Sequence, residues 1–122
     1  MLMNDISQPW LLCMERFAIF IKNYDDPSER LPEIKVALID DGVDATHGSL
    51  SRCIADGVTY LRRTERLYSP YYKSTRGHGT VMATLIRKIC PGAKILVARL
   101  DEERTNNGHE ITAASATKVR VT

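Results

Sequence analysis

Two short aliphatic segments constrain the fold of this chain more than any other feature of its sequence. Residues 34–39 read IKVALI and end abruptly at Asp40, Asp41 and Gly42, and residues 93–100 read AKILVARL. Nearly continuous aliphatic segments of this length are typical of strands that are buried on both faces of a parallel sheet. We therefore expect the first segment to be the first core strand and the second to be another buried strand.

Helical patterns separate and follow these strands. Apolar residues recur at helical spacing over residues 80–88, and Pro91 and Gly92 end that pattern. Residues 57–60 predict a weaker strand, and a turn at 106–108 precedes a further helix from about residue 110. Strands that alternate with helices predict an α/β fold, in which right-handed crossovers place helices on both faces of a parallel sheet.

The N-terminal segment predicts a separate helix from about residue 9 to 23. Apolar side chains recur there at helical spacing, and Pro9 suits the first helical position. Residues 24–32 then hold charges and two prolines, which is typical of an exposed connector. We therefore assign 1–30 to a helical extension and linker and 31–122 to the main domain. The helix has few cations, which favours packing on its own protein over binding to a membrane surface.

Size and charge exclude several classes of protein. The length of 122 residues allows one domain at most. The formal net charge is +2, far from the dense basic stripe of a nucleic-acid binder. Residues 62–72 interleave basic and aromatic side chains, a pattern that also occurs in proteins that bind single-stranded nucleic acid. We nevertheless expect a solvated loop there. We therefore predict no nucleic-acid partner. We also predict no membrane partner, because no apolar segment approaches the ~20 residues of a membrane span.

The cysteines and the N-terminus favour a reducing compartment. Cys13, Cys53 and Cys90 form no CxxC pair, so we expect neither a zinc site nor a disulfide framework, but three small buried hydrophobes. The first residues also lack the basic start and the cleavage site of a secretory signal. We therefore expect an intracellular location.

The candidate catalytic residues lie at the end of the first strand and at the start of the central helix. Function in an open α/β sheet gathers at the carboxyl ends of the strands, where Asp40 and Asp41 stand. His78 lies between two glycines directly at the predicted helix start, and glycines let backbone or substrate approach closely. A histidine in this setting is a candidate general base.

Together these segments resemble the subtilisin-like serine peptidases (subtilases, the peptidase S8 family). Residues 36–44 (VALIDDGVD) are similar to the aspartate motif of that family, and residues 77–83 (GHGTVMA) are similar to its histidine motif. Residues 47–50 and 90–96 resemble the segments that follow the two motifs. The four matches stand in the family's chain order and cover about residues 33–116.

The resemblance implies a serine-type endopeptidase that acts on a peptide or protein substrate. Its implied catalytic residues in this chain are Asp40 and His78, with the aspartate orienting the histidine and the histidine activating a serine. No cofactor is implied. Calcium binding near Asp41 or Asp44 stays open, as does the oligomeric state.

Departures from the family pattern matter for activity. Asp41 replaces the usual Ser or Thr of the aspartate motif, and Gly48 replaces a Pro. None of the seven serines lies in the Gly-Thr-Ser-x-Ala motif that carries the family's nucleophile. We therefore expect this chain to be the front part of a subtilase domain and to be inactive alone.

Two other classes of function remain as alternatives. One is a non-catalytic interaction module derived from a degenerate subtilase. The other is a receiver-type phosphoacceptor domain, in which Asp40, Asp41 and Asp101 would form an acidic Mg²⁺ site, although residues 77–80 have no role in such a domain. We expect structural roles for His47 and His109.

Overall fold

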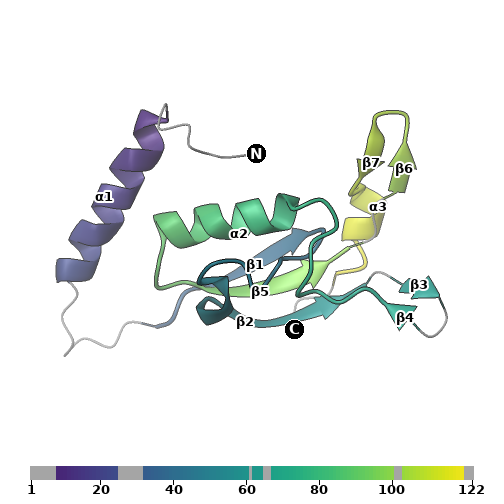
Figure 1. Ribbon diagram of the computed structural model, residues 1–122, viewed down its shortest axis with the longest axis horizontal. Coiled ribbons are helices and arrows are strands. Elements are labelled where there is room, and N and C mark those ends of the chain that lie inside the picture. The colour runs from purple at the N-terminus through teal and green to yellow at the C-terminus, as the bar shows by residue number, and fades with distance from the viewer. Residues whose placement is uncertain (1–7, 25–31, 61, 65–66, 101–102, 120–122) are drawn as a thin grey trace.

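A parallel sheet forms the centre of the computed structural model, which describes residues 8–24, 32–60, 62–64, 67–100 and 103–119 (Figure 1). Its three strands are β1 (Lys35–Asp40), β2 (Ile54–Thr59) and β5 (Lys94–Arg99), in the order β1-β5-β2. The two aliphatic segments of the sequence are therefore neighbours, and Leu38 pairs with Val97. This arrangement confirms the predicted α/β fold with a parallel sheet.

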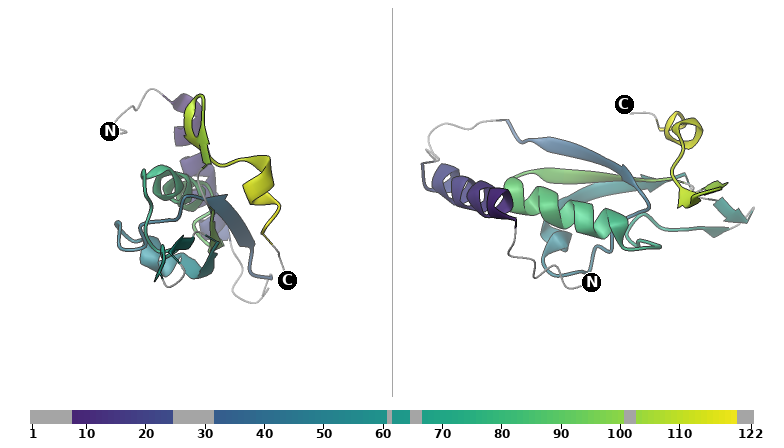
Figure 2. Two further views of the ribbon diagram at one scale, coloured as in Figure 1. Left: turned by 90° about the vertical axis from the view of Figure 1, so that its right-hand side faces the viewer. Right: turned by 90° about the horizontal axis from the view of Figure 1, so that it is seen from above.

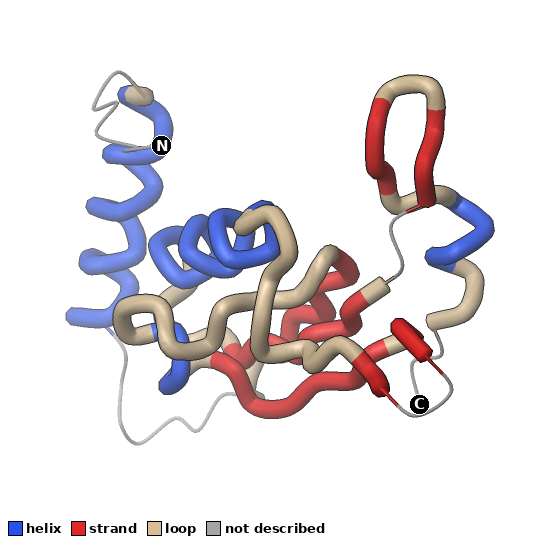
Figure 3. The backbone as a smooth tube through the Cα atoms, turned by 45° about the vertical axis from the view of Figure 1, so that its right-hand side comes forward, coloured by secondary structure: helices blue, strands red, loops and turns tan. Residues whose placement is uncertain are grey.

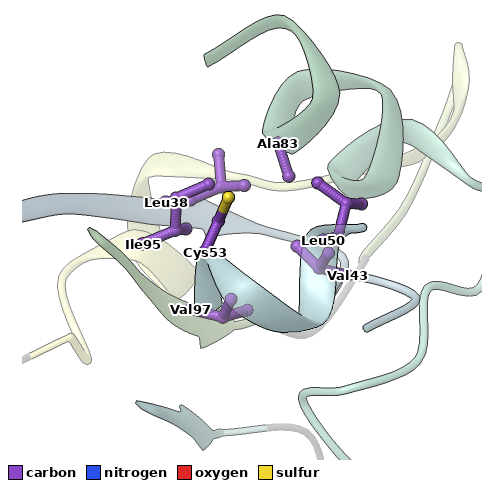
Figure 4. Close-up of a cluster of buried hydrophobic side chains, with 7 residues drawn as sticks. All are labelled: Leu38, Val43, Leu50, Cys53, Ala83, Ile95 and Val97. Carbon is purple, nitrogen blue, oxygen red and sulfur yellow. The ribbon is translucent and has the colours of Figure 1, made fainter. Parts of the chain in front are cut away.

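Helix α2 (His78–Ile89) lies along one face of the sheet, as Figure 1 and Figure 2 show. Its Ala83 joins a core that also includes Leu50 of the 3₁₀ turn η1 (Leu50–Arg52). The core cluster consists of Leu38, Val43, Leu50, Cys53, Ala83, Ile95 and Val97 (Figure 4). Successive side chains of a strand point to opposite faces, so Ile39, next to Leu38, lies on the other face and is 41% exposed.

A valine-to-alanine substitution should lower the free energy of unfolding by different amounts on the two faces of the sheet. Val97 is 1% exposed and Val58, on the adjacent strand, is 46% exposed. Val97→Ala should lower the free energy of unfolding by about 2 kcal/mol, because it removes two buried methyl groups and leaves a cavity. Val58→Ala should cost less than about 0.5 kcal/mol. Urea titration of both variants measures the difference, and equal losses would contradict this assignment of the core.

Helix α1 (Pro9–Tyr24) packs against α2, as expected for a helix that contacts its own protein (Figure 2). Ala18 is its buried residue, and Glu15 Oε1 lies 3.6 Å from Lys88 Nζ of α2. Several of its large apolar side chains are exposed: Trp10, Leu12, Phe17, Ile19, Phe20, Ile21 and Tyr24. Most of the predicted connector, residues 25–31, lies outside the described residues, so the domain boundary stays a prediction.

Two short hairpins replace segments that were expected to be loops (Figure 3). β3 (Arg62–Thr64) pairs with β4 (Leu67–Tyr68) in the basic and aromatic segment, and β6 (Glu103–Thr105) pairs with β7 (Gly108–Glu110) across the predicted turn. Strands of two or three residues carry too little periodicity to be recognised in a sequence. The last helix, α3 (Ala113–Ala116), begins where one of two expected start residues stands, after a cap in which Thr112 Oγ1 accepts a hydrogen bond from the Ser115 N–H.

The cysteines and helices allow two further comparisons with the sequence. Cys53 is buried in the core as expected, but Cys90 is only half-buried and Cys13 is exposed on α1. The expectation of three buried cysteines was therefore wrong for Cys13, because its helix buries little of its surface. Among the described helices, none combines the length and the apolar character needed to cross a bilayer.

The start of α2 lies directly against the loop that follows β1. A Cβ atom added to Gly79 would stand 1.9 Å from the carbonyl oxygen of Gly42, and one added to Gly42 would stand 2.0 Å from that of Lys73. Gly42 also has a φ of +96°, which residues with a side chain rarely adopt. Three backbone segments can meet here only because both positions are glycine.

This close approach predicts that even a methyl group at position 79 destabilises the protein strongly. Gly79→Ala should lower the free energy of unfolding by about 2 kcal/mol or more, because the new methyl group forces α2 away from the loop. Gly92, which is exposed and has no atom within 4 Å of an added Cβ, provides the matched control. Gly92→Ala should change the stability by less than about 0.5 kcal/mol. A tolerated Gly79→Ala in the urea titration would contradict the packing.

Candidate active site

The carboxyl end of β1 meets the N-terminus of α2 at Asp40 and His78. His78 Nδ1 lies 2.7 Å from Asp40 Oδ2. The other carboxylate oxygen of Asp40, Oδ1, accepts a hydrogen bond of 2.7 Å from the backbone N–H of Asp41. The carboxylate is thus held at one oxygen by the adjacent backbone and faces the imidazole with the other.

The two side chains of this pair differ in their access to solvent. The Asp40 side chain is 10% exposed, whereas the His78 side chain is 67% exposed. An ionised Asp40 accepts a hydrogen bond from an Nδ1–H group of the ring, which leaves Nε2 as a hydrogen-bond acceptor. The pair therefore combines a shielded carboxylate with an imidazole that is open to a further partner.

The local sequence explains why His78 stands at this place. His78 is the first residue of α2, and the preceding Gly77 has a φ of +82°, which turns the chain sharply into the helix. The N–H of Gly77 donates a hydrogen bond of 2.8 Å to Ser74 Oγ. The two glycines beside His78 therefore have separate functions, because Gly77 makes the turn and Gly79 allows the close approach to β1.

Asp41 is buried, and its carboxylate accepts hydrogen bonds from the segment around His78. It is 2% exposed, and its Oδ1 accepts hydrogen bonds of 2.8 Å from Ser74 Oγ and of 2.8 Å from the N–H of Gly79. Its Oδ2 accepts a third hydrogen bond, of 3.0 Å, from the N–H of Arg76. All three donors belong to residues 74–79, the segment that carries His78.

A buried cation holds the start of the same segment. Arg99, at the end of β5, is 4% exposed. Its Nη1 donates to the carbonyl oxygens of Pro70 at 2.9 Å and Lys73 at 2.8 Å, and its Nη2 donates to Thr75 Oγ1 at 2.5 Å. Neither Ser74 nor Arg99 was singled out in the sequence. An arginine within an otherwise aliphatic segment, at the last position of β5, is the signal that could have pointed to Arg99.

The other candidate residues lie apart from this pair or outside the described residues. Asp44 is exposed and accepts a hydrogen bond of 3.1 Å from Thr46 Oγ1, and His47 is also exposed. Asp101 and the side chain of His109 lie outside the described part. Within the described ranges, no three or more His, Cys, Asp or Glu residues form a group that could hold a metal ion. Calcium binding near Asp41 or Asp44 stays an open question.

Comparison with known proteins places the chain in a family. Searches of the curated proteins and of the solved structures returned no match. The family model described as the subtilase family (peptidase S8) matches residues 32–121. This range includes β1, β5 and the whole of α2. This match covers most of the chain, so the chain belongs to the subtilase family and holds a subtilase-like protease domain.

Proposed function

We propose that this chain supplies the general base and its orienting carboxylate to a serine endopeptidase. The observation that supports this proposal is the 2.7 Å contact between His78 Nδ1 and Asp40 Oδ2, in a chain of the subtilase family. The two residues come from different elements that are 38 residues apart in sequence. Their contact therefore results from the fold and not from local chain geometry.

The chemistry follows from the two nitrogens of the ring. Asp40 accepts a hydrogen bond from Nδ1–H, so Nε2 keeps a lone pair that removes the proton of a serine hydroxyl as its oxygen attacks a peptide carbonyl. The imidazolium formed in this step is stabilised by the negative charge of Asp40. His78 then donates that proton to the leaving amine, which completes acylation.

The nucleophilic serine, in this proposal, comes from a segment outside these residues. Ser74 is the serine nearest to His78 in sequence, but its hydroxyl donates to Asp41 Oδ1 and accepts from the Gly77 N–H. None of the seven serines lies in the motif of the family's nucleophile. The 122-residue chain is accordingly proposed to be inactive alone.

The alternative functions differ in what they require of the acidic residues. A receiver-type site needs carboxylate oxygens that are open to Mg²⁺, but Asp41 is buried and accepts three hydrogen bonds. A non-catalytic module of subtilase origin would keep the same fold without needing a base.

A fluorophosphonate probe and a peptide substrate test the proposal. The 122-residue chain should not be labelled, whereas the chain joined to a serine-bearing subtilase segment should be labelled and should hydrolyse peptide. In that joined chain, Asp40→Asn should lower kcat by about 10⁴-fold, because the histidine loses its orientation. Asp44→Asn is the matched control, and it should leave kcat almost unchanged, since the Asp44 side chain contacts Thr46 and not His78.

Three outcomes would contradict the proposal. Labelling of the 122-residue chain that disappears on heat denaturation would reveal a nucleophile within it. Equal losses from Asp40→Asn and Asp44→Asn would mean that the wrong carboxylate is assigned. A well-folded joined chain without activity would favour the interaction module.

A further inference from the structure

We propose that Asp41 is a positioning residue, whose buried carboxylate caps the N-terminus of α2 from the neighbouring strand and thereby fixes His78 against Asp40. The importance of this role rests on the proposed function, because His78 is the base to be positioned. The contacts that define the role do not depend on it.

The start of α2 lacks the usual cap. The first N–H groups of a helix have no partner within the helix, and a Ser, Thr, Asp or Asn side chain at the N-cap position normally accepts one of them. Here the N-cap residue is Gly77, and no side chain at that position forms a hydrogen bond. The Asp41 carboxylate instead accepts from the N–H of Gly79, 38 residues further along the chain, at 2.8 Å. Its negative charge also matches the positive end of the helix dipole.

Both neighbours of His78 are connected to this one carboxylate. Gly79 is bound directly, through its N–H. Gly77 is bound through Ser74, whose hydroxyl accepts from the Gly77 N–H and donates to Asp41. The backbone on each side of His78 is therefore fixed relative to Asp41, and this limits where the imidazole can lie.

The backbone of Asp41 acts on the other partner of the pair. Its N–H donates to Asp40 Oδ1 at 2.7 Å, so that Asp40 Oδ2 faces His78 Nδ1. One residue thus orients the carboxylate with its amide and orients the histidine segment with its side chain. This double contact distinguishes Asp41 from a residue that merely fills space in the core.

The number of donors explains why a carboxylate suits this position. Three donors approach Asp41 from Ser74, Arg76 and Gly79, and they are shared between two oxygens. A Ser or Thr side chain, the usual residue of the family motif here, has one oxygen and could not accept at both places. A carboxylate can be buried at such a position because charge-assisted hydrogen bonds replace its hydration.

Amide hydrogen exchange and ¹⁵N NMR of the 122-residue chain test the role without any peptidase activity. Asp41→Asn keeps the size of the side chain, but its amide nitrogen cannot accept a hydrogen bond. The exchange rate of the Arg76 N–H, the Gly79 N–H or both should rise by about tenfold or more, while that of the Val97 N–H in β5 should stay the same. The His78 ring should change from one dominant tautomer to a mixture.

Two variants complete the experiment. Asp44→Asn lies in the same loop and serves as the control, with no change expected at Arg76, Gly79 or the His78 ring. If Asp41→Asn does not fold, Asp41→Ser keeps one acceptor oxygen, and faster exchange is then expected at Arg76 or at Gly79 but not at both.

The proposal is overturned if exchange rises equally at Val97 and Gly79, which would indicate a general loss of stability. It is also overturned if exchange and tautomer stay unchanged in the variant that folds. Because these readouts involve no substrate and no serine, an inactive joined chain would contradict the proposed function and leave this result intact.

Discussion

The close approach of the end of β1 to the start of α2 is the constraint on which the rest of this structure depends. It requires a glycine at position 79, since an added Cβ there would stand 1.9 Å from the carbonyl oxygen of Gly42. Gly42 in turn lets the segment before α2 approach, since an added Cβ there would stand 2.0 Å from the carbonyl oxygen of Lys73. Only at this separation can Asp40 reach the imidazole and Asp41 reach the N–H of Gly79. The parallel sheet and the core beneath α2 hold the two backbones at that distance.

Buried charges organise the segment that carries the candidate base. Residues 70–77 contain no helix or strand, so their polar groups need partners from elsewhere. Arg99 donates to carbonyl oxygens at the start of this segment, and Asp41 accepts from N–H groups near its end. Each charge replaces its lost hydration with hydrogen bonds to the segment. Two strand ends thus fix a loop that has no regular structure of its own.

Sequence patterns predicted the parts of the molecule in which neighbouring residues share one environment. The aliphatic segments gave β1 and β5, helical spacing gave α1 and α2, and the two motifs indicated Asp40 and His78. The short hairpins were missed because their strands are too brief for a pattern. The contacts of Ser74, Arg99 and Asp41 were missed because they join residues 24 to 38 positions apart, and only the folded chain determines such pairs. The exposure of Cys13 likewise depends on how little of α1 is covered.

The tautomer of His78 tests the central claim most directly. ¹⁵N NMR of the ¹⁵N-labelled 122-residue chain, without substrate and at neutral pH, measures it. The account predicts a proton on Nδ1 and a free lone pair on Nε2, the opposite of the tautomer that a free histidine side chain favours in water. A correlation between the ring nitrogens and the ring C–H protons distinguishes the two forms. A dominant proton on Nε2 in the folded chain would contradict the claim, because Asp40 would then not be holding the imidazole as an acceptor for a serine proton.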